Sequence, residues 1–72
     1  MDPKQLLRDY LRGREIAPAV FARQLDYDKG NFHRLLNSDD AWPSLELAFL
    51  IDQETGGAVP MAAWAEAKAR AA

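Results

Sequence analysis

The 72-residue sequence predicts an all-α fold, a compact five-helix bundle forming a single domain over residues 1–72. Apolar residues recur at helical spacing in five separate stretches, and no stretch shows the strict alternation of apolar and polar residues that is typical of strands. Capping residues, prolines and glycines punctuate the chain at short intervals, so each helix is expected to be short. The hydrophobic share of 49% is enough for one small core.

The first predicted helix begins at Pro3, because Asp2 can cap it and proline suits the first helical position. Gly13 is well placed to end this helix. Its single apolar stripe consists of Leu6, Leu7, Tyr10 and Leu11.

The second and third predicted helices begin differently. Ala17-Pro18 opens the second, and because alanine offers no capping oxygen, this start depends on tertiary packing. Asp28 caps the third, which runs to about Asn37, and its carboxylate favours the positive end of the helix dipole. The residues expected to face the core are Phe21, Ala22 and Leu25 in the second helix and Phe32, Leu35 and Leu36 in the third.

Two further helices are predicted over residues 44–55 and 61–71, the first capped by Ser44 and ended by Gly56-Gly57. The first of these is apolar nearly all round. We expect its core-facing residues to be Leu45, Ala48 and Ile51. Since a helix that is apolar on all faces must be buried, either the last helix or a second chain covers the remainder, and we expect both. The predicted dimer or partner interface consists of Leu47, Phe49, Leu50, Met61 and Trp64.

The composition excludes several kinds of protein. There is no cysteine, so disulfides and thiolate metal sites are impossible, and a single histidine excludes a His-rich metal cluster. No apolar run approaches the length of a membrane span. We find no nucleophile–base pair, cofactor loop or metal set, so we expect a non-enzymatic cytoplasmic protein with no cofactor, no metal, no membrane and no small-molecule ligand.

The charge is unevenly distributed along the chain. The net charge is −2, but residues 1–37 carry seven Lys/Arg against five Asp/Glu, whereas residues 38–72 carry two against six. An acidic chain with a basic half can bind DNA, with a small phosphate footprint and modest non-specific affinity.

The basic half contains a motif, PAVFARQLDYDKGNFHRLLN, at residues 18–37. The small Ala22 lies where two helices must approach closely, a short turn follows Leu25, and Phe32 lies ten positions after the alanine. This spacing is typical of a DNA-binding helix-turn-helix. The sequence here resembles the Cro and lambda-repressor type (XRE-like) of helix-turn-helix protein, which is common in phage and bacterial regulators. The later stretch WPSLELAFLIDQETGGAVPMAAW is similar to the tail of many short members.

The resemblance implies which residues contact DNA. The base-reading positions fall on Lys29, Gly30, His33, Arg34 and Asn37. Helical geometry agrees, because the core-facing stripe leaves these residues on the opposite face. The candidate phosphate contacts are Asn31, Arg14, Arg23 and Ser38.

Several positions leave alternatives open. Asp26 stands where the family usually has glycine in a left-handed turn, a conformation that aspartate tolerates, and Pro18 replaces a frequent phosphate contact. Gly30 is either tolerated in the first turn or lets the backbone approach DNA. His33 either contacts DNA or is solvent-exposed without a role, and Asp39-Asp40 is expected to be a solvated turn.

The resulting expectation is a transcriptional repressor that occludes promoter DNA as a homodimer. Its partner would be double-stranded DNA, read in the major groove of a pseudo-palindromic operator at the nucleoid. The alternative is a protein-interaction module of the same fold, antitoxin-like or an adaptor, with only non-specific DNA affinity.

Overall fold

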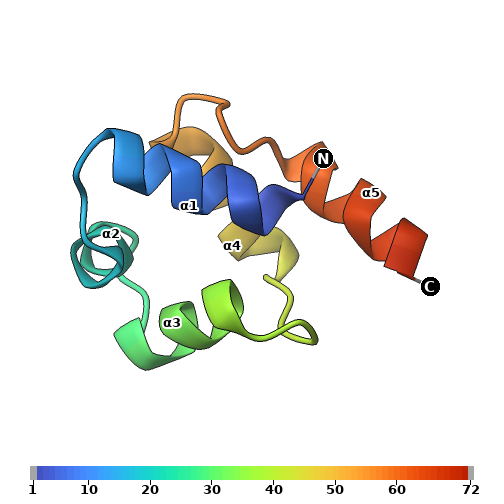
Figure 1. The fold of residues 1–72 in the computed structure, drawn as a ribbon, viewed down its shortest axis with the longest axis horizontal. Coiled ribbons are helices and arrows are strands. Elements are labelled where there is room, and N and C mark those ends of the chain that lie inside the picture. The colour runs from blue at the N-terminus through green and yellow to red at the C-terminus, as the bar shows by residue number, and fades with distance from the viewer. Residues whose placement is uncertain (1, 72) are drawn as a thin grey trace.

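The computed structural model describes residues 2–71, and Figure 1 shows the helices of this part of the chain. They are α1 (Pro3–Gly13), α2 (Pro18–Gln24), α3 (Lys29–Asn37), α4 (Leu45–Glu54) and α5 (Met61–Ala71). No strand occurs in this range, so the predicted all-α class and its five helices are confirmed. No helix in the same range is long and apolar enough to cross a membrane.

The predicted helix starts are confirmed by their hydrogen bonds. The Asp2 carboxylate accepts the Lys4 N–H at 3.0 Å, and the Ser44 hydroxyl accepts the Leu47 N–H at 3.1 Å. Ala17 makes no side-chain cap, as expected, and Pro18 takes the first turn of α2. Polar caps therefore define the starts of α1 and α4, whereas α2 depends on packing.

α1 is the central element of the arrangement. Helices α2 and α3 pack together, α4 and α5 pack together, and α1 contacts both pairs through α3 and α5. Figure 1 shows α1 running across the molecule, with α2 at one end and α5 at the other. α3 lies at the edge of the molecule, so its outer face is not covered by another helix.

The core is built mainly from aromatic and leucine side chains. The ring centroids of Phe21 and Phe32 lie 5.7 Å apart, and those of Tyr10 and Phe21 lie 6.3 Å apart. Burial of each large apolar side chain contributes about 1.5–3 kcal/mol. The buried hydrophobic cluster consists of Leu7, Leu11, Phe21, Ala22, Leu25, Phe32, Leu35, Leu36, Leu47, Ala48, Ile51, Val59 and Trp64.

The inner face of α4 differs from the prediction. Leu45, expected in the core, is 78% exposed, whereas Leu47, expected on the outside, is 3% exposed. Trp64 is also buried, so Leu47 and Trp64 belong to the core of the chain and cannot supply interface area. Of the predicted interface, Phe49 is exposed, and Leu50 and Met61 are half-buried. The face was misplaced because a helix that is apolar nearly all round has no periodicity to mark its inner side.

Helices α1, α2 and α4 end in the same way, in a Schellman motif with a left-handed residue after the cap. In each, the N–H two residues after the cap donates to a carbonyl five residues earlier: Ile16 to Leu11, Tyr27 to Ala22 and Gly57 to Asp52. The left-handed residues are Glu15, Asp26 and Gly56, with φ of 56°, 55° and 62°. α1 ends at Gly13, as predicted, but its left-handed residue is Glu15, two positions later.

The corner between α4 and α5 is tied by two polar side chains. The Thr55 hydroxyl donates to the Ile51 carbonyl at 2.7 Å and accepts the buried Val59 N–H at 3.2 Å. The Asp52 carboxylate accepts the Met61 N–H at 3.1 Å and so occupies one free donor at the start of α5. These bonds fix the direction in which α5 leaves α4.

Candidate nucleic-acid interface

α2 and α3 are joined by a turn whose geometry depends on Asp26. Its φ of 55° confirms the expectation that aspartate takes a left-handed backbone here. The Asp26 N–H donates to the Arg23 carbonyl at 3.0 Å, and the Tyr27 N–H donates to the Ala22 carbonyl at 2.9 Å. The turn closes without glycine, and it sets α3 against α2 through Phe21 and Phe32.

The start of α3 gives a physical reason for Gly30. The Asp28 carboxylate accepts the Asn31 N–H at 2.8 Å and so caps the helix as predicted. A Cβ atom at Gly30 would lie 3.1 Å from the same carboxylate, closer than side chains normally approach. Glycine therefore leaves room for the cap, a reason that neither sequence-based alternative contained.

The C-terminal end of α3 is held by two cations of α1. The Lys4 ammonium donates to the Ser38 carbonyl, and the Arg8 guanidinium donates to the Leu36 carbonyl. Lys4 is 8% exposed and lies 5.4 Å from the centroid of the Trp42 ring. Both cations sit at the negative end of the helix dipole, where positive charge is favourable. We refer to Lys4 and Arg8 as the α1 anchor.

The outer face of α3 carries the predicted base-reading residues. Phe32, Leu35 and Leu36 are buried, as predicted. The exposed residues are Lys29, Gly30, His33, Arg34 and Asn37. The structure thus confirms that these five are accessible on the side opposite the core stripe.

The accessible residues fall on different parts of that face. Lys29 lines a cleft beside α2 whose lining also includes Arg23 and the acids Asp26 and Asp28. Arg34 lies in a second cleft on the side toward α4. Neither cleft is lined by His33 or Asn37, which form the outer ridge of α3. Arg34 lies to one side of this ridge, whereas Lys29, four residues before His33, continues it.

His33 and Asn37 are joined to each other along this ridge. The Asn37 amide nitrogen donates to the His33 carbonyl at 2.8 Å and lies 3.3 Å from Nδ1 of the imidazole. The bond to the His33 carbonyl uses one of the two N–H groups of the Asn37 amide nitrogen. Bidentate reading of adenine uses the same nitrogen together with the amide oxygen, so this intrahelical bond constrains how the Asn37 amide can approach a base.

The predicted phosphate contacts are dispersed. Asn31 lies in the first turn of α3, and Arg23 lies near Lys29. The Arg14 guanidinium lies 5.1 Å from the centroid of the Tyr10 ring, whose hydroxyl contacts the Glu54 carbonyl at the end of α4. Arg14 therefore packs on a ring of α1 that in turn contacts α4. The Ser38 hydroxyl donates to the Asp40 carboxylate at 3.3 Å.

The positive charge of the first half of the chain is only partly available to a ligand. The α1 anchor uses Lys4 and Arg8, and Arg12 lies 3.8 Å from Asp9. Within residues 2–71, no ion pair or side-chain hydrogen bond involves the cations that surround α3, which are Arg23, Lys29 and Arg34. The positive charge that is available to a ligand at this site therefore comes from these three side chains.

Two features of the site were not predicted from the sequence. Tyr27 was treated only as part of a turn, yet it is 37% exposed and borders both clefts of α3. A signal was present, because an aromatic residue directly before a helix cap is placed beside the first turn. The α1 anchor was also missed, since it joins residues 34 and 28 positions apart.

The described residues contain no cluster of three or more side chains suited to hold a metal ion. Comparisons with models of protein families, with curated proteins and with solved structures find no match. The functional argument therefore rests on the geometry around α3.

Proposed function

We propose that the chain is a sequence-specific DNA-binding regulator, with a helix-turn-helix of the Cro and lambda-repressor type formed by α2 and α3. One observation carries this proposal. α3 buries Phe32 and Leu35 against the rest of the chain while its opposite face, including His33 and Arg34, is polar and accessible. The major groove of B-DNA is about 12 Å wide and admits one α-helix presented in this manner.

The local charges support a DNA partner of limited affinity. Three cations surround α3, whereas the chain as a whole carries a net charge of −2. Non-specific DNA binding scales with the number of neutralised phosphates, so one copy is expected to bind weakly. Selectivity for one DNA sequence is then expected to come from base contacts of α3 and from dimerisation.

We propose that regulation is repression by occupancy, exerted by a homodimer on promoter DNA. The exposed Leu45 and Phe49 of α4 supply apolar surface for a second copy. A two-fold dimer places its two reading helices in successive major grooves, about 34 Å apart, and so reads a pseudo-palindrome.

A second candidate function is protein recognition by the same fold. It is favoured by an apolar groove of about 180 Å³ between the start of α4 and α5, whose lining includes Trp42, Leu45 and Met61. In this alternative the groove binds a different protein, and DNA affinity stays at the non-specific level.

Fluorescence polarisation with two labelled duplexes tests the proposal. The first is the promoter region of the chain's own gene, and the second is a scrambled duplex of equal length. The chain is expected to prefer the promoter, and the double substitution Lys29→Ala with Arg34→Ala should cost about 1–3 kcal/mol per side chain. The matched control is Arg70→Ala, which removes an exposed cation paired with Glu66 on α5. Equal affinity for both duplexes would contradict the proposal and favour the protein-recognition alternative.

A further inference from the structure

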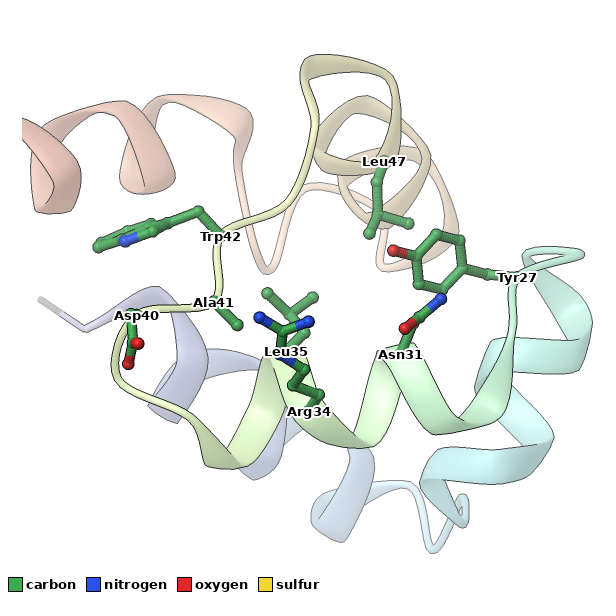
Figure 2. A pocket seen from close by; sticks show the side chains of 8 residues that line it. All are labelled: Tyr27, Asn31, Arg34, Leu35, Asp40, Ala41, Trp42 and Leu47. Carbon is green, nitrogen blue, oxygen red and sulfur yellow. The ribbon is translucent and has the colours of Figure 1, made fainter.

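A cleft of about 330 Å³ lies between α3 and the segment that leads to α4. Figure 2 shows Arg34 and Asn31 rising from α3 into this space, with Tyr27 reaching into it from the turn before α3. Leu35 and Leu47 form its apolar floor, and both are buried. We refer to this space as the α3–α4 cleft.

The α3–α4 cleft gathers hydrogen-bond donors. The Tyr27 hydroxyl comes from the turn before α3. The Asn31 amide and the Arg34 guanidinium come from successive turns of α3. Within residues 2–71, no hydrogen bond or ion pair occupies any of these three side-chain groups. Several donors, one of them a permanent cation that binds oxyanions bidentately, suit a phosphate group.

The location of the cleft points to the DNA backbone as the source of that phosphate. An α-helix with its side chains is about as wide as the major groove, so the flanks of a reading helix face the sugar-phosphate strands and its ridge faces the bases. Arg34 and Asn31 lie on such a flank, whereas His33 and Asn37 lie on the ridge.

We propose that the α3–α4 cleft binds a phosphodiester group of the DNA backbone, so that Arg34 positions the protein on DNA and does not read a base. Tyr27 and Asn31 complete the site. This inference rests on the proposed function and changes it in one respect, because base selectivity then falls on the ridge residues His33 and Asn37 and on the Gly30 backbone.

Asp40 adds an acidic side chain to the α3–α4 cleft. Asp40 is one of the residues that line the α3–α4 cleft, whereas the neighbouring Asp39 is not. The Asp40 carboxylate accepts a hydrogen bond from the Ser38 hydroxyl. A carboxylate beside a bound phosphate repels it, so Asp40 restrains affinity for every DNA sequence alike. This restraint favours release from non-specific DNA.

The test compares affinity on two duplexes over a range of salt concentrations. One duplex comes from a binding-site selection with the full chain, and the other is its scrambled counterpart. Arg34→Ala should weaken binding to both duplexes by the same factor, about tenfold, and reduce the slope of log K against log salt by about 0.9. Tyr27→Phe should weaken both equally but leave the slope unchanged, because it removes a neutral donor. Arg12→Ala, which removes an exposed cation of α1, is the matched control and should leave both the affinity for the two duplexes and the salt slope unchanged.

Substitution of Asp40 tests the inference independently in the same binding assay. Asp40→Asn should strengthen binding to both duplexes by about two- to threefold, and Asp39→Asn should do so by less. The inference is overturned if Arg34→Ala affects only the selected duplex at an unchanged salt slope, which is the signature of a base contact. It is also overturned if the two acid substitutions act equally. Failure of the wild-type chain to prefer any duplex would instead overturn the proposed function itself.

Discussion

Gly13 occupies a helical position that does not need glycine. Its φ is not positive, and a Cβ atom there would meet nothing within 4 Å. Gly13→Ala is therefore expected to raise the free energy of unfolding by about 0.5–1 kcal/mol, because alanine restricts the unfolded chain and favours the helix. Denaturant unfolding at constant m-value measures the gain. Gly56→Ala is the control and should lower stability, since Gly56 has a φ of 62°.

Asp26 presents the opposite situation, since it holds a left-handed backbone without being glycine. This conformation is unfavourable for residues with a Cβ, although less so for aspartate. Asp26→Gly is expected to stabilise the chain by about 0.5–1 kcal/mol in thermal or denaturant unfolding. Gln24→Gly, two residues earlier at the end of α2, should destabilise it. A loss of stability in Asp26→Gly would show that its side chain contributes more than the strain costs.

At the scale of single residues, the sequence predicted caps and exposure better than contacts. The roles of Asp2, Asp28 and Ser44 followed from local rules, because a cap bonds an amide only two or three positions away. The strain at Glu15 was missed since Gly13 offered a more visible helix end. The role of Gly30 was missed because it depends on where one carboxylate oxygen lies.

At the scale of elements, Thr55 joins the end of α4 to the segment before α5. It is 5% exposed, and its hydroxyl is the acceptor for the buried Val59 N–H. Thr55→Val keeps the shape but leaves that N–H without a partner, so it should cost about 1–3 kcal/mol of unfolding free energy. Thr55→Ser retains the hydroxyl and should recover most of the loss. Equal destabilisation by both substitutions would show that the methyl group contributes as much to stability as the hydroxyl.

The α1 anchor, Lys4 and Arg8, is expected to stabilise the contact between α1 and the end of α3. Lys4→Met removes the bond to the Ser38 carbonyl but keeps an apolar stem against Trp42. The expected result is a loss of about 1–2 kcal/mol in unfolding and faster amide hydrogen exchange in the last turn of α3. Arg12→Met, which replaces an exposed cation of the same helix, is the control and should change neither. Unchanged exchange in Lys4→Met would mean that α3 is held by its packing alone.

The number and bounds of the helices could be predicted because caps, prolines and glycine pairs act locally. The rotation of α4 could not, since its apolar residues lie on nearly all sides and only the surrounding helices select Leu47 over Leu45. The clefts beside α3 were likewise beyond the sequence, because they form between segments that meet only after folding.

At the scale of the whole molecule, exposed apolar surface remains on α4. Leu45 is 78% exposed and Phe49 is 49% exposed, so charged substitutions there should cost little folding stability. For the proposed homodimer, Leu45→Glu together with Phe49→Glu should shift the sedimentation equilibrium toward monomer with an unfolding midpoint close to that of the wild type. Val20→Glu, on α2, is the matched exposed control. Identical association of both variants would exclude this part of α4 from the interface.

The hydrogen bonds of the α1 anchor to the end of α3 are accepted by main-chain oxygens, those of Leu36 and of the cap residue Ser38. Every residue contributes the same carbonyl group, so the attachment of α3 at this end does not depend on which side chains its outer face carries. The side chains on the outer face of α3 are therefore not needed to hold this end of the helix in place. Under the proposed function, exchanging those side chains alone is expected to change the target sequence, and the same property suits the chain to the grafting of a different recognition surface.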